Sequence, residues 1–416
     1  MGKYIINGGR RLDGRIELQT SKNAVLPILA ASVLTSEQVV LEAFPKIDDV
    51  KNMVCILQSL GCRVTESGGS AVIDNSNTDK FYIPNSLAKE LRSSIFLLGP
   101  VLGRFQYAKV SYPGGCDIGL RPIDLHLKGL KCLGVEINEH NGIIECDGRN
   151  MRGGVVQLDF PSVGATENIM LAGATAKGRT IIRNAAKEPE IVDLQNFVNS
   201  MGGRVVGAGC STIEIEGVER LHGTTYRPIP DRIAAGTYLL AGVMCGGKLE
   251  ISGCIPEHIY SLIFKLRESA CKIDCIHDKI YLEQNGRPQA VHMVETSPYP
   301  GFPTDLQAQF MACSTLATGT GVIVENIFET RFRHAAELIK MGANITVRDR
   351  MAIVRGVPAL RGAEVYAHDL RGGAALVLAG LAAEGQTVVN DIKHIERGYE
   401  DMEGVLTSLG ADITRI

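Results

Sequence analysis

The sequence repeats a unit of about 70 residues six times, and this repeat constrains the fold more than any other feature. Each unit contains an amphipathic helix, then a small residue, then a short strand rich in β-branched side chains. Glycine is expected between them, because the position after a helix commonly needs a left-handed backbone. The six junction residues are Gly61, Gly134, Gly202, Ala270, Gly342 and Gly410. Ala270 departs from this pattern and should reduce local stability.

Each unit also contains a second helix upstream, poor in charge and rich in small residues. Helices that are apolar on all sides should be buried, and small residues let them pack closely. We expect these helices to begin near Asn23, Arg92, Ser162, Pro230, Thr304 and Arg371. Each unit is therefore predicted to run helix, strand, helix, strand, strand, which makes the protein α/β.

The sixth unit lacks its last strand, because the sequence stops three residues after Ile413. The start of the chain can supply it: Leu12-Asp-Gly resembles Met151-Arg-Gly, Leu221-His-Gly and Leu360-Arg-Gly at the same spacing. We therefore expect residues 1–21 to close the sixth unit. This predicts one domain of residues 22–229 and a second of residues 1–21 and 230–416. Two chain crossings between domains would suit hinge closure around a ligand.

Composition and spacing exclude several classes of protein. A net charge of −3 without runs of like charge argues against nucleic acid and anionic membranes as partners. The longest apolar run, Ile233 to Cys245, is too short to span a bilayer, and the first residues lack a signal-peptide core. Eleven scattered cysteines without a Cys-x-x-Cys pair predict a reduced, cytoplasmic protein. No metal-binding spacing of histidines and no phosphate-binding glycine loop is present.

The segment Tyr112 to Leu125 carries a cysteine in a loop. Cys116 can lie in neither helix nor strand, because Pro113 and several glycines surround it. Arg121 follows five residues later. A thiol on such a loop, beside a guanidinium, can be tuned toward thiolate and presented to a substrate. The alternative is an ordinary turn holding an inert cysteine.

Polar residues on the apolar helices gather where the helices start. Serine, threonine and aspartate at such positions commonly act as N-caps. We interpret the following residues as N-caps: Ser162, Asp231, Thr304 and Asp369. Lysine and arginine need another explanation, because a cation at a helix N-terminus opposes the helix dipole.

Lys22, Arg92 and Arg371 are cations at the starts of these helices. An anion bound at the same place would be stabilised by both the dipole and the side chain. They therefore predict a phosphate-rich ligand, and a surface salt bridge is the alternative for each. Arg331 and Arg397 lie in loops equivalent to the Cys116 loop and fit the same ligand.

Seven motifs, in order, resemble those of the UDP-N-acetylglucosamine enolpyruvyl transferase (1-carboxyvinyltransferase) family over nearly the whole chain. They are Ser21-Lys-Asn-Ala-Val-Leu-Pro, Pro113-Gly-Gly-Cys-Asp-Ile-Gly-Leu-Arg-Pro, Phe160-Pro-Ser-Val-Gly-Ala-Thr, Lys187-Glu-Pro-Glu-Ile-Val-Asp, Pro303-Thr-Asp-Leu-Gln-Ala-Gln-Phe, Asp369-Leu-Arg and Arg397-Gly-Tyr-Glu. The resemblance implies a fold of two inside-out α/β barrels, each built from three repeats. That fold agrees with the six units found in the sequence.

The resemblance also implies a reaction that needs no cofactor and no metal. The enolpyruvyl group of phosphoenolpyruvate would move to the 3′-hydroxyl of UDP-N-acetylglucosamine with release of phosphate, the first committed step of peptidoglycan synthesis. Cys116 corresponds to the proton donor, and its thiol can also add to C2 as a side adduct. Asp305 corresponds to the group that takes the hydroxyl proton. Fosfomycin-type epoxides should alkylate Cys116.

The remaining correspondences concern substrate binding and the loop. Lys22, Arg121 and Arg397 match phosphate contacts, and residues 112–121 would form a lid. The other implied substrate-binding positions are Asn23, Arg92, Pro122, Ile123, Asp124, Leu125, Ser162, Val163, Gly164, Asp305, Ile327, Arg331, Asp369 and Arg371. Asp117 is unexpected beside the cysteine, and we hypothesise that its carboxylate raises the pKa of Cys116.

Two alternative functions remain open at this point. A 3-phosphoshikimate enolpyruvyl transferase shares the fold and the chemistry but lacks the cysteine loop. A catalytically silent homologue could bind a UDP-sugar and regulate, yet Cys116, Asp305 and Arg397 are all present. The oligomeric state is not predicted by the sequence, and a monomer is compatible with it.

Overall fold

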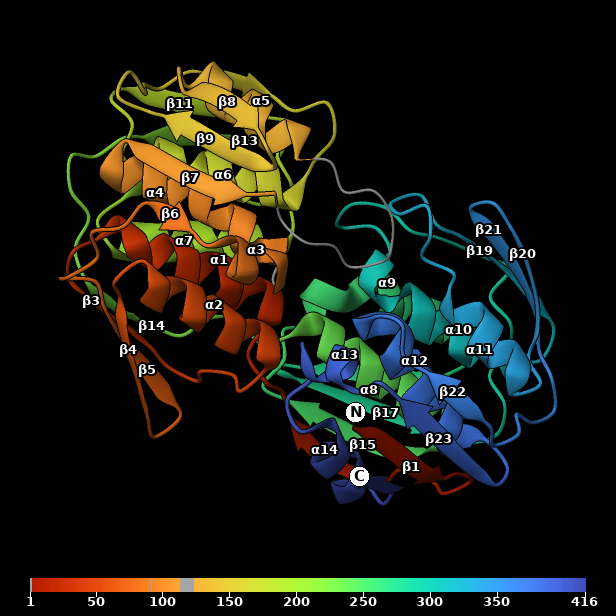
Figure 1. The fold of residues 1–416 in the computed structure, drawn as a ribbon. Helices are drawn as coiled ribbons and strands as arrows, with labels where there is room; N and C mark the ends of the chain where they lie inside the picture. The colour runs from red at the N-terminus through yellow and green to blue at the C-terminus, as the bar shows by residue number, and fades with distance from the viewer. Residues whose placement is uncertain (1, 91, 113–122) are drawn as a thin grey trace. The chain divides into compact units, whose positions relative to one another are not determined.

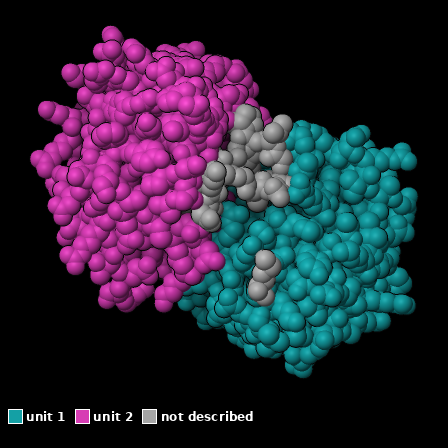
Figure 2. Space-filling view, in the orientation of Figure 1, with its two compact units in different colours: residues 1–19, 116–120, 230–416 teal, residues 20–115, 121–229 magenta. Residues whose placement is uncertain are grey.

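The computed structural model describes residues 2–90, 92–112 and 123–416. Contacts divide the chain into two compact units, which Figure 2 colours teal (unit 1) and magenta (unit 2). Unit 1 contains residues 2–19 and 230–416, and unit 2 contains the described residues between 20 and 229. Each unit has its own hydrophobic core.

The strands form six four-stranded sheets that share one arrangement, with three sheets in each unit. In every sheet an edge strand pairs in parallel with the next strand, and the other two pairs are antiparallel. In unit 2 the orders are β14 (Thr224–Tyr226), β3 (Gln38–Leu41), β5 (Ser70–Asp74), β4 (Arg63–Ser67); β6 (Tyr82–Ile83), β7 (Tyr107–Ser111), β9 (Ile143–Asp147), β8 (Glu136–His140); and β10 (Val155–Gln157), β11 (Arg179–Arg183), β13 (Thr212–Glu216), β12 (Arg204–Val206).

The three sheets of unit 1 follow the same rule. Their orders are β2 (Gly14–Glu17), β15 (Gly247–Ser252), β17 (Lys279–Gln284), β16 (Lys272–Ile276); β18 (Met293–Glu295), β19 (Thr320–Val324), β21 (Met351–Arg355), β20 (Asn344–Arg348); and β22 (Glu364–Tyr366), β23 (Gln386–Asn390), β1 (Lys3–Asn7), β24 (Asp412–Arg415). Buried and exposed residues alternate along most strands, as in sheets with one face on the core.

Strand β1 lies between β23 and β24, at the position that the last strand of a repeat occupies in the other sheets. The prediction that residues 1–21 close the sixth unit is therefore confirmed. The next strand, β2, belongs to another sheet, where it pairs in parallel with β15.

The Leu-x-Gly motif precedes parallel edge strands because backbones approach closely there. A Cβ on Gly153 would lie 2.4 Å from the carbonyl oxygen of Arg179, and one on Gly362 would lie 2.2 Å from that of Gln386. Glycine at these positions therefore leaves room for the neighbouring strand.

The apolar helices lie at the centre of each unit, as their composition predicts. In unit 2 they are α1 (Lys22–Ala31), α4 (Leu98–Phe105) after the 3₁₀ turn η2 (Arg92–Leu97), and α6 (Val163–Gly173). In unit 1 they are α8 (Arg232–Cys245), α10 (Gln307–Thr315) after the 3₁₀ turn η4 (Thr304–Leu306), and α12 (Leu370–Ala382). Helices α8, α10 and α12 contact one another (Figure 1). With helices inside and sheets outside, each unit is an inside-out α/β barrel of three repeats.

The amphipathic helices are half-buried and complete the repeats. They are α2 (Asp48–Ser59), α5 (Asp124–Cys132), α7 (Pro189–Ser200), α9 (Tyr260–Glu268), α11 (His334–Lys340) and α14 (Met402–Ser408). Short additional helices are α3 (Asn85–Glu90), α13 (Lys393–Glu396), η1 (Ser32–Leu34) and η3 (Pro256–Ile259). Within the described ranges, every helix is too short or too polar to cross a membrane.

The second residue after each amphipathic helix has a positive φ, in the left-handed region. The five glycines there have φ values between 83° and 103°. Ala270 takes the same place with φ 64°, and the amide of Cys271 bonds the carbonyl of Leu266 at 3.0 Å to close the helix end. The repeat thus imposes on an alanine a conformation that suits glycine.

Candidate active site

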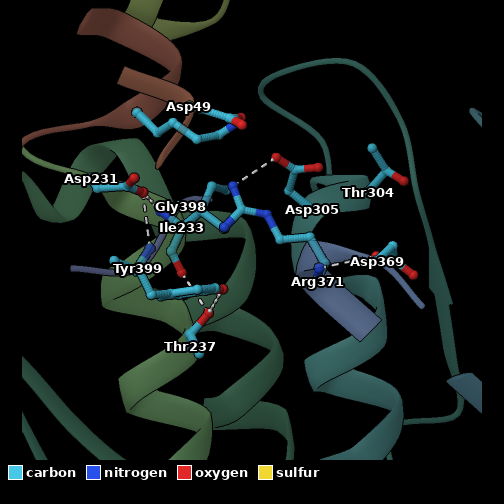
Figure 3. A network of polar contacts seen from close by, with 12 residues as sticks. Asp49, Asp231, Ile233, Thr237, Thr304, Asp305, Asp369, Arg371, Gly398 and Tyr399 are labelled. Atoms are coloured by element: carbon cyan, nitrogen blue, oxygen red, sulfur yellow. Dashed lines mark hydrogen bonds and ion pairs between the residues drawn. The ribbon is translucent and has the colours of Figure 1, made fainter. Parts of the chain in front are cut away.

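Asp305 lies in unit 1 between two buried arginines. It belongs to the 3₁₀ turn that leads into α10, one of the apolar helices. Its Oδ1 accepts a hydrogen bond from Arg331 Nη2 at 3.0 Å. Its Oδ2 accepts one from Arg371 Nη2 at 3.1 Å (Figure 3). The side chain of Asp305 is 26% exposed, whereas each arginine side chain is 3% exposed. Solvent therefore reaches the carboxylate while the two cations remain covered.

Arg371 keeps its charge in spite of its burial. Burial opposes the guanidinium charge, but Tyr399, Asp305 and Asp231 together outweigh it and raise the pKa of Arg371 above its ordinary value. Within the part of the chain that the structure describes, Nε and Nη1 of Arg371 and Nε of Arg331 have no hydrogen-bond partner. Unpaired buried donors are unfavourable. These N–H groups can therefore bind an anion at little further desolvation cost.

Three of the four expected N-caps are present. Asp369 Oδ1 accepts from the amides of Arg371 and Gly372, both at 3.0 Å. Asp231 accepts from the amide of Ile233 at 2.8 Å, and the hydroxyl of Ser162 accepts at 3.3 Å at the start of α6. Asp369 thus fixes the first turn of α12, on which Arg371 lies.

The N-cap prediction for Thr304 is wrong. Pro303 occupies the N-cap position, and the Thr304 hydroxyl instead donates to Glu325 Oε2 at 2.9 Å. The hydrogen bond that Thr304 donates to a buried carboxylate is stronger than the bond that its neutral hydroxyl would accept from a helix amide. The side chain therefore turns away from the helix end.

Glu325 is a residue of this region that the sequence did not reveal. It is fully buried at the end of β19, and its Oε1 accepts from the amides of Ile327 and Phe328 at 2.9 and 3.0 Å. Since Oε2 bonds Thr304, this carboxylate joins the loop carrying Ile327 and Arg331 to the turn carrying Asp305. An acid directly after an apolar strand was the only sequence signal.

A second cluster lies in unit 2, at the start of α1. Lys22 is the first residue of that helix, and its Nζ pairs with Asp49 Oδ2 at 3.1 Å. Asp49 lies in the first turn of α2, and its side chain is 1% exposed against 13% for Lys22, so the pair is largely buried and is not the surface salt bridge considered from the sequence. Asn23 follows in the same turn of α1. Asp49 was not predicted.

The expected nucleotide-sugar positions of unit 2 come together at two helix starts. Ile123 precedes α5, and Asp124 and Leu125 begin it. Helix α6, which contacts α5, begins with Val163 and Gly164.

His126 and Asn168 join these two helices. The Asn168 amide lies 2.8 Å from His126 Nδ1 and donates to the carbonyl of Ile95 at 2.7 Å. Its oxygen accepts from the amide of Gly99 at 2.7 Å. One buried asparagine therefore links α5 and α6 to the segment η2–α4, which begins with Arg92.

Three expected site residues, Cys116, Arg121 and Pro122, and the side chain of Arg92 lie outside the described residues. Arg397 directly follows α13, is half-buried, and precedes Tyr399 by two residues. Within the described ranges, no group of three His, Cys, Asp or Glu side chains is placed to hold a metal ion.

Comparison with known proteins agrees with this geometry. Residues 6–406 match the family model of EPSP synthase (3-phosphoshikimate 1-carboxyvinyltransferase). Among solved structures, the enolpyruvyl transferase NikO from Streptomyces tendae has a TM-score of 0.89 at 25% identity, covering 100% of this chain and 98% of NikO. EPSP synthase from Acinetobacter baumannii has a TM-score of 0.76 at 16% identity over 100% of both chains and shows the fold alone. Fold and site thus define the class of enolpyruvyl transferases.

Curated relatives are more similar in sequence. UDP-N-acetylglucosamine 1-carboxyvinyltransferase 2 of Caldanaerobacter subterraneus subsp. tengcongensis is 54% identical over 100% of both chains. UDP-N-acetylglucosamine 1-carboxyvinyltransferase 1 of Carboxydothermus hydrogenoformans is 49% identical over 100% of this chain and 99% of its own length. The namesake of Staphylococcus aureus (strain N315) is 47% identical over 100% of both. The chain belongs to the family of UDP-N-acetylglucosamine 1-carboxyvinyltransferases.

Proposed function

We propose that this protein transfers the enolpyruvyl group of phosphoenolpyruvate to the 3′-hydroxyl of UDP-N-acetylglucosamine and releases phosphate. The reaction is the first committed step of peptidoglycan synthesis. The observation that carries the proposal is the Asp305 carboxylate, held between two buried guanidinium groups that retain unpaired donors. It combines a proton acceptor with an anion site, the two features that this reaction needs.

Asp305 is the proposed general base. Each of its oxygens already accepts one arginine hydrogen bond, which favours the ionised carboxylate. A carboxylate oxygen has two lone pairs, so the Asp305 carboxylate has the acceptor capacity to take the proton of the 3′-hydroxyl. The partial exposure of Asp305 leaves room for that hydroxyl.

The proposed reaction proceeds by addition of the 3′-hydroxyl to phosphoenolpyruvate followed by elimination of phosphate. C3 of phosphoenolpyruvate takes a proton from the Cys116 thiol, and C2 becomes electrophilic. The 3′-oxygen then bonds C2 while its proton passes to Asp305, giving a tetrahedral intermediate. Loss from C2 of inorganic phosphate, which takes the proton from Asp305, and return of a C3 proton to the Cys116 thiolate restore the carbon–carbon double bond and both side chains.

The cations hold the anionic groups of phosphoenolpyruvate and the leaving phosphate. Arg331 and Arg371 offer unpaired donors beside Asp305. Lys22, Arg121 and Arg397 complete the proposed set. Fixed charges of this kind stabilise a transition state most where water is excluded.

The starts of α5 and α6 are the proposed site for the uridine nucleotide, through residues 121–125 and 162–164. Asn23 and Ile327 would contact the sugar and the intermediate, and Asp369 acts through its cap on α12. We also propose that residues 22–229 and residues 1–21 with 230–416 are the two domains. The ten cysteines of the described residues are all free, which supports a reducing, cytoplasmic location.

The test is inorganic phosphate release from phosphoenolpyruvate with UDP-N-acetylglucosamine present and absent. Release should require the nucleotide sugar and should not occur with shikimate 3-phosphate. Release with shikimate 3-phosphate instead would show that the protein is a 3-phosphoshikimate enolpyruvyl transferase. Binding of the nucleotide sugar without turnover would show that it is a regulatory homologue.

A further inference from the structure

We propose that Tyr399 is a positioning residue for the reaction, because its ring and hydroxyl together hold the Arg371 guanidinium against Asp305. The inference rests on the proposed function, and in particular on the role of Asp305 as base. Tyr399 belongs to the Arg397-Gly-Tyr-Glu motif, but neither the motif nor the proposed chemistry gives it a task.

The hydroxyl of Tyr399 makes two hydrogen bonds. It lies 2.8 Å from Thr237 Oγ1 (Figure 3). It also accepts from Gln309 Nε2 at 3.1 Å. The Thr237 hydroxyl donates its single proton to the carbonyl of Ile233 at 2.8 Å. Thr237 Oγ1 can therefore only accept from Tyr399, so the Tyr399 hydroxyl must be the donor.

Gln309 completes the arrangement. Its Nε2 also lies 3.2 Å from Thr237 Oγ1, so the side-chain amide donates toward both hydroxyl oxygens. Thr237 lies in α8, Gln309 lies in α10, and Tyr399 follows α13. One phenol hydroxyl thus ties together segments from all three repeats of unit 1.

The ring of Tyr399 supports Arg371. The guanidinium carbon of Arg371 lies 5.4 Å from the ring centroid, within the range of a cation–π contact. Tyr399 and Arg371 are each 3% exposed, so water does not weaken the attraction. Two of the three guanidinium nitrogens of Arg371 have no hydrogen-bond partner among the described residues. The aromatic face and the bond to Asp305 therefore orient the group.

Arg331 and Tyr238 provide comparisons. Arg331 also lies against a ring, that of Phe328 at 5.7 Å, so both arginines that hold Asp305 are backed by aromatic faces. Tyr238 is equally buried in unit 1, but its hydroxyl has no partner among the described residues. Tyr238 fills the core, whereas Tyr399 carries a hydrogen-bond anchor and a charged neighbour.

The experiment compares Tyr399→Phe and Tyr399→Leu with the control Tyr238→Phe. Phosphate release gives kcat and KM for both substrates, and thermal unfolding of each variant reports folding. We expect Tyr399→Phe to lower kcat roughly tenfold and Tyr399→Leu roughly a hundredfold, since small misplacements of reacting groups reduce turnover by such factors. KM for UDP-N-acetylglucosamine should stay within about twofold, because the change concerns positioning at the reacting atoms.

A double-mutant cycle separates positioning from general loosening. In an Arg371→Lys background, which removes the planar group, Tyr399→Phe should lower kcat by less than about twofold further. Thr237→Val, which removes the acceptor of the Tyr399 hydroxyl, should lower kcat in the same direction as Tyr399→Phe. This variant serves if replacement of Tyr399 prevents folding.

Three results would overturn the inference. They are an unchanged kcat for both Tyr399→Phe and Thr237→Val, an equal effect of Tyr399→Phe with and without Arg371, and an equal loss in Tyr238→Phe. A wild-type protein that releases no phosphate, or a fully active Asp305→Asn variant, would refute the proposed function itself. An active wild type in which Tyr399→Phe and Thr237→Val are both neutral would refute only the role of Tyr399.

Discussion

Replacing Ala270 by glycine should stabilise the protein, because this residue has φ 64° in a position that five other repeats give to glycine. The left-handed conformation costs an alanine about 1 to 2 kcal/mol. Glycine avoids that strain but gives the unfolded chain more freedom, which removes about 0.4 to 1 kcal/mol of the gain. Ala270 is exposed, so removing its methyl group exposes little buried surface. The difference predicts a gain of about 0.5 to 1 kcal/mol.

Equilibrium unfolding in urea measures this change. The midpoint of the Ala270→Gly variant should rise while the slope stays the same, since the surface exposed on unfolding is unaltered. Gly342→Ala is the matched control at the equivalent junction of the fifth repeat, where φ is 91° and no heavy atom lies within 4 Å of the added Cβ. That variant should lose about 0.5 to 1 kcal/mol, because the strain on the alanine exceeds the stabilisation from its stiffer unfolded chain. A lower midpoint for Ala270→Gly, or no change in either variant, would refute the argument from backbone strain.

Three further predictions concern the site. Asp305→Asn should lower kcat by about 10² to 10⁴, as loss of a general base does; phosphate release near the wild-type rate would contradict its role. Fosfomycin should add the mass of one inhibitor molecule to the wild type and nothing to Cys116→Ala, as measured by intact-mass spectrometry. Labelling of both proteins would exclude the cysteine as the target. Burial, aided by Arg331, lowers the pKa of His334 to about 4, so the unfolded chain binds its proton first and stability should fall from pH 6.5 toward pH 4, by up to about 3 kcal/mol. His334→Leu should flatten that loss in urea unfolding at pH 7 and pH 5, and an unchanged loss would assign it to other groups.

The repeat could be predicted from the sequence because its causes are local. A left-handed residue after a helix favours glycine, and a helix of small apolar residues must be buried, so both features recur at fixed spacing. The starts expected near Asn23, Ser162 and Thr304 agree with helices or turns beginning at Lys22, Val163 and Thr304. The missing strand of the sixth unit was also predictable, since the same motif marks the other repeats.

The partners inside the site could not be predicted in the same way. Asp49 pairs with Lys22 from 27 residues away, and Tyr399 bonds Thr237 from 162 residues away. Nothing in the spacing of polar residues states which of them will share a buried position. Thr304 illustrates the limit: its type and place indicate a cap, but a carboxylate 21 residues later takes its hydroxyl.

The position of β1 has a consequence for biosynthesis. Its two neighbours in the sheet, β23 and β24, are synthesised after the whole of unit 2, so β1 cannot pair until that unit has been made. The residues of unit 2 are synthesised between Thr20 and Ile229 and can pack while the rest of the chain is still being added. Maturation of the nascent polypeptide should therefore be ordered, with the sheet that contains β1 closing only after unit 2 has been synthesised.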